Sequence, residues 1–444
     1  MKLTQKQVVI VAAGFILLVI IGIVVFFNIR KPNSAAQVNL TVWGTDSDAA
    51  MTGMLDAYQS ANKGSNITYK QIDPAQYRTE LLSALAAGTG PDVFEIGNRD
   101  LPQWQSVIAP LPQADATLFN DATLQADFPT VVGSDFADAQ GDIYALPLSL
   151  DTLAMIYNKD LVDSAGIALL PKTWDAFDAD IPKLRSINAQ GQLTQAAAAL
   201  GGSSASMPNA TDILYLLMLQ NGTQMTSRDF SSATFADNVN GGSGTGGSGA
   251  NPGVAAFDFY LQFSNSNSPY YTWTDSMGDA EGSFVNGKTA VIFDYASALP
   301  DIRKKAPFLN VGVAPMPQPT GASVAVNYPS YEGLAVARYG QVAAAWNFIV
   351  NLTTNAYETG LYNEKTGTPP ALRTAIAAGA GDPAMAVFGA QALTARSWHE
   401  ADAAKIDAAM SGAVTSVMTG QSDSAKALQT AQEAVNAIIH QQSQ

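Results

Sequence analysis

The sequence predicts an α/β fold built on an open sheet of parallel strands. Segments with the period-two alternation of a strand are separated by segments with helical spacing, and the connections between them are short. Consecutive parallel strands need right-handed crossovers through the intervening helices. With 444 residues, the chain is long enough for two or three domains.

The first elements alternate regularly. Residues 38–43 predict a strand, and Met51, Leu55 and Tyr58 then recur at helical spacing after the capping residues 46–48. Next we expect a strand at 67–72, a helix opened by Asp73-Pro74 and ended by Gly88, and a strand at 92–96. Further along, we expect strands within 143–158 and at 289–294 and 310–314, helices near 174–184 and 210–220, and mostly helix from 341 onward.

Composition excludes several classes of function. The net charge is −15 and charged residues make up 14%, so binding to a nucleic-acid backbone is disfavoured. The chain has no cysteine, which removes disulfides, thiolate nucleophiles and thiolate zinc sites. The two histidines, His399 and His440, lie near the C-terminus with no triad or metal-binding pattern around them. We therefore expect no metal, no cofactor and no enzymatic activity.

An unbroken run of 20 apolar residues, glycine included, extends from Val8 to Phe27. At about 1.5 Å per residue it would span roughly 30 Å, the thickness of a bilayer's hydrocarbon core. We expect a cytoplasmic tail at 1–7, a transmembrane anchor or signal-anchor at 8–29 and a tether at 30–37, with the main body outside the cytoplasm. The alternative is a signal peptide cleaved near residues 34–36.

A low-complexity segment of Gly, Ser and Thr occupies residues 241–249. We expect it to form a flexible surface loop, since these residue types cannot build a core. Residues 244–249 formally match the dinucleotide pattern G-x-G-x-x-G, but no strand precedes them. The segment therefore does not indicate nucleotide binding.

Four loops are candidates for ligand binding, because ligands of open parallel sheets bind beyond the carboxyl ends of the strands. They are residues 43–48, 97–100, 149–152 and 294–297, which combine aromatic rings with carboxylates, amides and one guanidinium. These groups are typical of sugar recognition. Each also has a structural alternative: Asp46 could cap a helix, Trp43 could pack in the core, Arg99 could pair with Asp100, and Asp151 could belong to a turn.

Eight stretches in order resemble the extracellular solute-binding proteins of ABC importers, the family that includes maltose-binding protein. They are Val42-Trp43-Gly44, Gly88-Thr89-Gly90-Pro91-Asp92-Val93, Tyr144-Ala145-Leu146-Pro147-Leu148-Ser149, Met155-Ile156-Tyr157-Asn158-Lys159-Asp160-Leu161, Pro171-Lys172-Thr173-Trp174, Phe284-Val285-Asn286-Gly287-Lys288-Thr289-Ala290, Ala344-Ala345-Trp346-Asn347-Phe348-Ile349 and Gly367-Thr368-Pro369-Pro370-Ala371-Leu372-Arg373. The resemblance covers roughly residues 38–440.

This resemblance implies a two-lobe periplasmic-binding-protein-like fold of type II, with the ligand held in the cleft between the lobes by hinge closure. The first lobe would comprise 38–149 and 316–366, and the second 150–315 and 367–444. Family contact positions carry over to Trp43, Thr45, Asp46, Asn98, Arg99, Asp100, Asp151, Asp294, Tyr295, Tyr331 and Trp398. Many sugar binders place a tryptophan in the 294–297 turn, where Tyr295 is the only aromatic residue here, which argues against a long malto-oligosaccharide.

The resemblance thus implies a membrane-anchored, extracytoplasmic solute-binding protein that delivers a carbohydrate to an ABC permease, and we expect it to be a monomer. One alternative keeps the fold as a tethered sensor or glycan-adhesion module without transport. Another is a glycosidase with paired carboxylates such as Asp46 and Asp151. Arg99 leaves phosphate or carboxylate ligands open, and peptides and polyamines stay possible.

Overall fold

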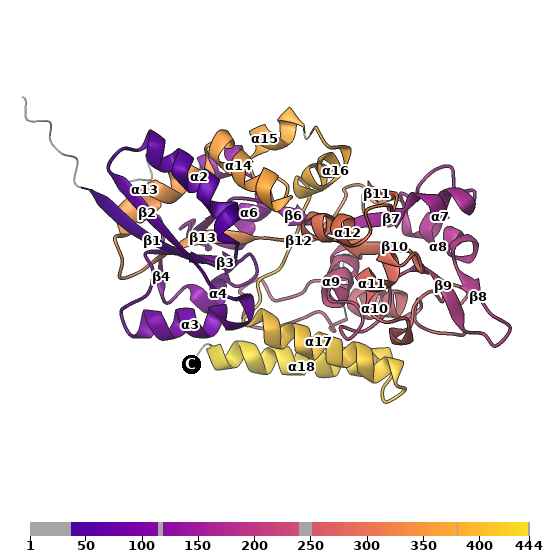
Figure 1. Cartoon of the computed structure of the whole chain (residues 1–444). Helices are drawn as coiled ribbons and strands as arrows, with labels where there is room; N and C mark the ends of the chain where they lie inside the picture. The colour runs from indigo at the N-terminus through magenta and orange to yellow at the C-terminus, as the bar shows by residue number, and fades with distance from the viewer. Residues whose placement is uncertain (1–36, 114–118, 239–250, 380, 443–444) are drawn as a thin grey trace, which may run out of the picture.

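Two α/β lobes lie side by side in the computed structural model, which describes residues 37–113, 119–238, 251–379 and 381–442 (Figure 1). The apolar run at 8–27 and the Gly/Ser/Thr segment at 241–249 lie outside these residues, so the expectations for them stay predictions. None of the helices in the described ranges is both long and apolar enough to cross a membrane.

The first lobe contains a six-stranded sheet in the order β2-β1-β3-β13-β4, with β5 also paired to β13. Its strands are β1 (Val38–Gly44), β2 (Ser65–Gln71), β3 (Val93–Gly97), β4 (Ile108–Ala109), β5 (Ala145–Pro147) and β13 (Glu332–Ala337). β1 runs parallel to β2 and β3, which confirms the parallel pairing expected here. β13 is antiparallel to β3, and its first residue, Glu332, lies opposite Gly97 at the end of β3.

The early helices of this lobe begin where capping side chains were expected. The Ser47 side chain accepts the N–H of Ala50 at the start of α2, and Asp73 accepts that of Ala75 at the start of α3. Several of the helices contact strands of the sheet, and others pack on neighbouring helices. The first-lobe helices are α2 (Asp48–Ala61), α3 (Pro74–Ala86), α4 (Leu101–Trp104), α5 (Asp121–Asp127), α6 (Thr130–Phe136), α13 (Val342–Thr353) and α14 (Ala356–Thr366).

The second lobe contains a five-stranded sheet in the order β11-β7-β10-β9-β8. Its strands are β7 (Ala154–Asn158), β8 (Ser186–Ile187), β9 (Leu193–Ala198), β10 (Thr289–Asp294) and β11 (Val311–Ala314). Its helices are α7 (Lys159–Ser164), α8 (Trp174–Leu184), α9 (Ala210–Gln220), α10 (Pro252–Leu261), α11 (Ala280–Val285) and α12 (Leu299–Lys305), with 3-10 helices η1 (Asp275–Met277) and η2 (Ala296–Ala298). The helices expected at 174–184 and 210–220 are confirmed as α8 and α9.

Two short strands join the lobes, since β6 (Asp151–Thr152) pairs antiparallel with β12 (Pro329–Ser330). Leu150 and Tyr331 belong to the core of the first lobe, whereas Leu153 and Tyr328 belong to that of the second. The chain therefore changes core within a few residues at each crossing, which is the geometry of a hinge.

After residue 315, the assignment of residues to the two hydrophobic cores differs from the lobe boundaries expected from the sequence. Met316, Val326 and Tyr328 lie in the range expected for the first lobe, but they pack in the core of the second. Ala371 and Leu372 were expected in the second lobe, but they pack in the core of the first. The chain thus returns to the first lobe at β12 and stays there beyond the end of α14.

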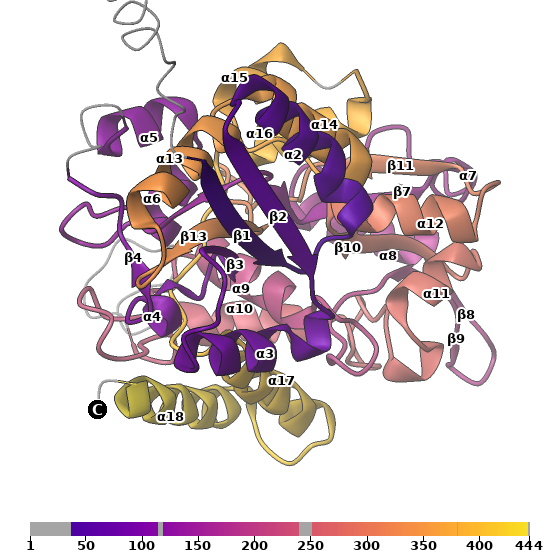
Figure 2. The same ribbon diagram turned by 60° about the vertical axis from the view of Figure 1, so that its left-hand side comes forward.

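The C-terminal part is mostly helical, as expected, with α15 (Arg373–Ala378), α16 (Pro383–Ala392), α17 (Ala403–Met418) and α18 (Ser424–Gln442). α17 packs against α18 and also contacts α9, while α18 contacts α10 of the second lobe. Figures 1 and 2 both show this helix pair along one side of the molecule, next to α3 of the first lobe. The segment that leads into α17 therefore lies between the lobes.

Candidate functional site

A cavity of about 300 Å³ lies between the lobes, at the edge where β1 and β3 end. Loops after β1 and β3, both crossings, η2, α14 and the start of α17 contribute to its lining. The lining residues are Asp46, Gly97, Asn98, Arg99, Asp100, Ser149, Asp151, Ser297, Ser330, Tyr331, Glu332, Tyr362, Thr368 and Ala403. Six of the sequence-predicted residues meet here: Asp46, Asn98, Arg99, Asp100, Asp151 and Tyr331.

Asp46 lies in the loop between β1 and α2 and reaches across to α14. The hydroxyl of Tyr362 donates a hydrogen bond to Asp46 Oδ2 at 2.6 Å. Burial raises the pKa of Asp46, and this hydrogen bond partly opposes the rise. Capping of α2 falls to Ser47, so the carboxylate of Asp46 is directed to the cavity rather than to the helix.

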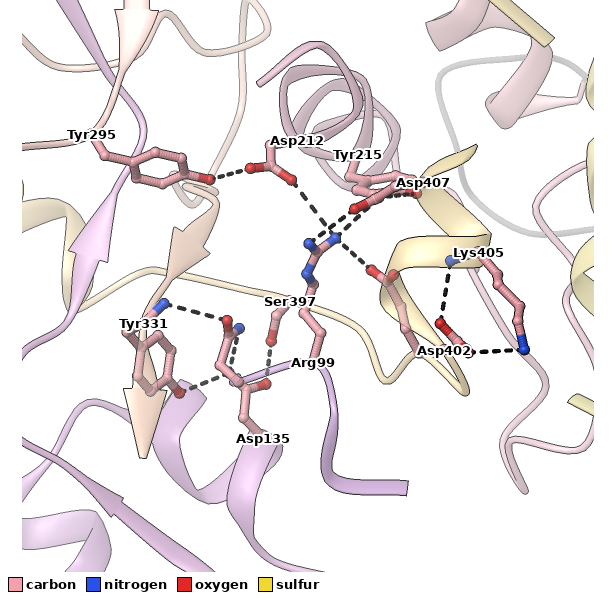
Figure 3. A network of polar contacts seen from close by, with 12 residues as sticks. Arg99, Asp135, Asp212, Tyr215, Tyr295, Tyr331, Ser397, Asp402, Lys405 and Asp407 are labelled. Atoms are coloured by element: carbon pink, nitrogen blue, oxygen red, sulfur yellow. Dashed lines mark hydrogen bonds and ion pairs between the residues drawn. The ribbon is translucent and has the colours of Figure 1, made fainter. Parts of the chain in front are cut away.

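Asn98 and Tyr331 are held by a buried carboxylate, Asp135 of α6. Asn98 Nδ2 and the Tyr331 hydroxyl donate to Asp135 Oδ2 at 3.1 and 2.7 Å, and the Ser397 hydroxyl donates to the other carboxylate oxygen. Burial raises the pKa of Asp135 to about 7, against the effect of these hydrogen bonds. Figure 3 shows Tyr331 and Ser397 directed at Asp135. The Asn98 amide and the Tyr331 side chain, which both line the cavity, are thus fixed in position.

Asp151 connects the first crossing to the second lobe. Its carboxylate accepts the backbone N–H groups of Ala296 at 2.9 Å and Ser297 at 3.0 Å, both in η2, and that of Thr152 at 2.8 Å. Burial raises the pKa of Asp151 to about 6, although these three donors stabilise the charged form. Asp151 therefore lines the cavity and also fixes the turn that follows β10.

Trp43 and Thr45, although predicted at the site, are not among the lining residues. Lys70 Nζ lies 4.0 Å from the ring centroid of Trp43, a cation–π contact on the first lobe. The backbone N–H of Thr45 donates to Glu95 Oε2 at 2.8 Å, and its hydroxyl approaches the same oxygen. Both residues therefore interact with partners inside the first lobe.

Asp294, Tyr295 and Trp398 are likewise outside the lining. Asp294 accepts a 2.7 Å hydrogen bond from Asn209, and the Tyr295 hydroxyl donates to Asp212 at 2.7 Å. The ring of Trp398 packs edge-on against Tyr215, with centroids 5.4 Å apart. The stacking surfaces expected from Tyr295 and Trp398 are therefore packed inside the protein in this arrangement.

Arg99 joins the loop after β3 to the second lobe through three carboxylates (Figure 3). Its guanidinium lies 2.9 Å from Glu400, 3.2 Å from Asp407 and 3.7 Å from Asp212 of α9. The Glu400 side chain is fully buried, and its second oxygen has no hydrogen-bond partner in the described ranges. Arg99 thus serves an interlobe ion-pair network rather than the pairing with Asp100 considered from the sequence.

Residues 397–407 form the other side of this network, and we call them the interlobe segment. Besides the Ser397–Asp135 contact, His399 Nε2 lies 2.6 Å from the carbonyl oxygen of Ser134 in α6, and the Glu400 N–H donates to the carbonyl oxygen of Arg99 at 3.0 Å. Asp402 lies 3.4 Å from Arg78 of α3. These contacts hold the lobes close together on the side of the molecule next to α3.

The lining residues Ser149 and Ser297 lie in the candidate loops 149–152 and 294–297. Others escaped the sequence analysis, notably Glu332, Tyr362, Ser330 and Thr368. Glu332 begins an antiparallel strand, so a rule about the carboxyl ends of parallel strands does not select it. Although Glu332 is exposed to solvent, partial desolvation by the surrounding protein and then the charges of Asp46 and Asp100 raise its pKa to about 7. The one sequence signal that could have identified Glu332 was its position next to Tyr331, which the sequence analysis had chosen as a ligand contact.

Replacing Arg99 with glutamine tests the burial of the interlobe network. The change leaves Glu400 without its counter-ion, so we expect the free energy of unfolding to fall by about 3–5 kcal/mol. Urea unfolding of the full chain measures this loss. The matched control is Arg78→Gln, which breaks the half-exposed pair with Asp402 and is expected to cost at most about 1 kcal/mol. Equal losses in the two variants would show that Arg99 does not neutralise a buried charge.

Asp135 predicts a specific dependence of stability on pH. Because its pKa is about 7 in the folded protein and about 4 when exposed, the native state binds this proton more tightly than the unfolded chain. Its contribution to the unfolding free energy therefore falls as pH rises from about 4 to 7.

The variant Asp135→Asn should consequently lose less stability than the wild type over this range, measured by urea unfolding at several pH values. Asp56→Asn, on the exposed face of α2, is the control and should keep the wild-type profile. An Asp135→Asn profile as steep as the wild type's would argue against the raised pKa.

Solved structures of binding proteins share this fold. The sugar-binding protein MalE of Xanthomonas citri gives a TM-score of 0.75 at 19% identity, covering 91% of this chain and 98% of that one. The cyclic α-maltosyl-1,6-maltose binding protein of Arthrobacter globiformis gives 0.73 at 19% identity, with 91% and 99% covered. UgpB of Mycobacterium tuberculosis, in complex with glycerophosphocholine, gives 0.71 at 20% identity, again with 91% and 99% covered. At these identities the similarity establishes the two-lobe fold.

Sequence comparison identifies the family. A Brucella abortus protein described as a binding protein is 26% identical to the chain over 295 residues. The matched region covers 65% of this chain and 65% of the length of that relative. The diacetylchitobiose binding protein DasA of Streptomyces coelicolor is 27% identical over 158 residues, which are 33% of this chain and 34% of DasA. The family model described as bacterial extracellular solute-binding protein matches residues 43–359. The chain belongs to this family of bacterial extracellular solute-binding proteins.

Proposed function

We propose that the chain binds a carbohydrate in the interlobe cavity and delivers it to an ABC permease, without catalysing a reaction. The observation that carries the proposal is the chemistry of the lining, which combines carboxylates, hydroxyls and an amide with the aromatic side chains of Tyr331 and Tyr362. The solved structures of MalE and of the cyclic α-maltosyl-1,6-maltose binding protein share the fold, and the sequence relative DasA is named as a diacetylchitobiose binding protein; these names support a saccharide as the ligand.

The arrangement suits a polyhydroxylated ring. Carboxylates such as Asp46 and Asp100 can each accept more than one hydroxyl donor, while the Tyr331 ring offers an apolar surface for C–H groups. The Asp100 side chain makes no capping hydrogen bond to α4 within the described residues. The cavity volume, about 300 Å³, is at the lower end for small-molecule sites, which favours a ligand of one or two rings.

The same lining disfavours a phosphate-bearing ligand such as the one bound to UgpB. Arg99 is the one basic residue among the lining residues, and its guanidinium already pairs with Glu400, Asp407 and Asp212. An anion would face the four lining carboxylates without a free cation. A neutral or cationic solute avoids this repulsion.

Ligand capture would proceed by rotation of the lobes about β6 and β12. The paired crossings are short, so a change in a few backbone dihedrals moves one core relative to the other. Closure buries the hydroxyls of the ligand, and a buried polar group without a partner costs about 1–3 kcal/mol. Specificity would therefore depend on the hydroxyl pattern.

The proposal places the body outside the cytoplasm, consistent with an extracellular solute-binding family. The apolar run at residues 8–27 would hold the protein at the membrane beside its permease, in place of a lipid attached to cysteine. Digestion of intact cells by an external protease tests this placement. The body should be degraded, and a fully protected body would contradict it.

A thermal-shift screen of the full chain against mono- and disaccharides tests the binding function. A ligand at about 100 times its dissociation constant should add roughly 2.7 kcal/mol to the unfolding free energy, a shift of a few degrees. Asp100→Asn removes a charged acceptor and should weaken binding roughly tenfold or more. Asp56→Asn, outside the cavity, should bind like the wild type. Saccharides that leave the transition unchanged, or that bind equally well to Asp100→Asn, would contradict the proposal.

A further inference from the structure

A second cavity lies between the lobes, beside the segment that connects α16 to α17. Its volume is about 430 Å³, within the range of small-molecule sites, and it shares no lining residue with the first cavity, the one at the ends of β1 and β3. α6 of the first lobe and the end of α9 of the second both contribute to its walls. The lining residues are Thr130, Val131, Ser134, Leu219, Val324, Ala325, Leu393, Thr394, Ala395, Arg396 and Ser397.

Aliphatic side chains in the wall of the second cavity are exposed to water. Val324 and Leu393 expose 56% and 42% of their surface, and Leu219, also in the lining, is half-buried. Removal of such surface from water by an apolar molecule is favourable. A hydrocarbon body therefore suits this cavity better than a sugar ring.

The polar groups of the second cavity differ in whether the protein satisfies them. Its four hydroxyl groups all have hydrogen-bond partners in the protein; they belong to Thr130, Ser134, Thr394 and Ser397. Arg396 is the one charged residue of the described lining, and its side chain makes no hydrogen bond or ion pair within the described chain. Since none of these lining residues carries a carboxylate, the donors of Arg396 fit an anionic group of a ligand. A carboxylate matches a guanidinium with two parallel hydrogen bonds.

The shape of the second cavity depends on the position of the lobes, because both lobes form its walls. Val131 belongs to the core of the first lobe, whereas Leu219 packs against that of the second. The chain also passes from the first core to the second between Ala395 and Trp398, and residues 395–397 line the cavity. An occupant that fits the walls in this arrangement of the lobes therefore stabilises this arrangement.

Asp135 links the second cavity to the first. Ser397, which lines the second cavity, donates to one carboxylate oxygen of Asp135. Asn98 and Tyr331, which line the first cavity, donate to the other oxygen. The two cavities thus share a buried hydrogen-bonding group, and the same arrangement of the lobes forms both.

We propose that the second cavity binds a small monocarboxylate with an apolar body, and that this ligand favours the lobe arrangement in which the first cavity binds its solute. The carboxylate group would bond to Arg396, while the hydrocarbon would cover Val324 and Leu393. Binding of the monocarboxylate does not depend on the proposed carbohydrate function, whereas its effect on the solute rests on that function.

Matched ligands separate the contributions of charge and apolar body. Calorimetry of the full chain at pH 7 compares cyclohexanecarboxylate, benzoate and hexanoate with their neutral carboxamides, and with acetate, which has the charge but little of the body. At least one of the three carboxylates should bind roughly fivefold or more tightly than its carboxamide, as expected for charge-assisted hydrogen bonds. Acetate should bind at least about tenfold more weakly than that carboxylate, because it covers little apolar surface.

Arg396→Gln is the informative variant. Because Arg396 is exposed and has no side-chain partner within the described chain, the variant should fold with wild-type stability. Its affinity for the carboxylate should fall to that for the carboxamide. Lys304→Gln removes the same charge from an exposed position on α12, outside the linings of both cavities, and should bind the carboxylate like the wild type.

The effect on the first cavity is measured with saccharides. With the carboxylate at saturation, whichever of maltose, cellobiose and glucose binds should gain roughly fivefold in affinity. Saturating saccharide should raise the affinity for the carboxylate by the same factor, since coupling between two sites is reciprocal. Arg396→Gln should bind the saccharide like the wild type and lose the gain.

The outcomes separate the second site from the carbohydrate function. Carboxylates that do not bind, that bind no better than their carboxamides, or that bind Arg396→Gln as tightly as the wild type would overturn the second site and leave the carbohydrate function intact. Saccharide affinity that is unchanged by bound carboxylate would overturn the effect on the lobes. If no saccharide binds, the carbohydrate function and this effect are both contradicted, while the calorimetry of the carboxylates still decides the second site.

Discussion

Arg99 carries the polar connection between the two lobes. It comes from the loop after β3, whereas its partners come from α9 and from the interlobe segment that leads into α17. With the lobes apart, Asp212, Glu400 and Asp407 would lie near one another without a counter-ion, which is costly for buried groups. Approach of the lobes and neutralisation of these charges therefore occur together. The position of the cavity beside this loop follows from that coupling.

The paired crossings at β6 and β12 determine how one lobe can rotate relative to the other. Each lobe has its own hydrophobic core, and the chain passes from one core to the other within a few residues at β6 and β12. Asp151 sits at this point and accepts N–H groups from η2 of the second lobe. Rotation of the second lobe would thus carry η2 and Asp151 with it, while Asn98 and Tyr331 stay with Asp135 in the first lobe. The lining is divided between the two moving bodies, as a solute trap requires.

Local sequence signals located the elements and part of the site. Helix caps such as Ser47 and Asp73 and the period-two strands placed the β1–β3 region, and the parallel-strand rule brought Asp46, Asn98 and Asp100 to one edge. Glu332 was missed because β13 enters the sheet antiparallel, a long-range pairing that no local pattern encodes. For Trp398 and Tyr295 the sequence could not decide between packing and ligand contact. That choice depends on Tyr215 and Asp212, far away in the chain.

The most direct test of the account is a crystal structure of the chain with the saccharide that stabilises it most. We expect electron density for the sugar between residues 97–100 of the first lobe and Ser297 of the second, with hydroxyls bonded to Asp46 or Asp100 and a ring against Tyr331. Density for the sugar on an outer surface, with the interlobe cavity empty, would contradict the central claim.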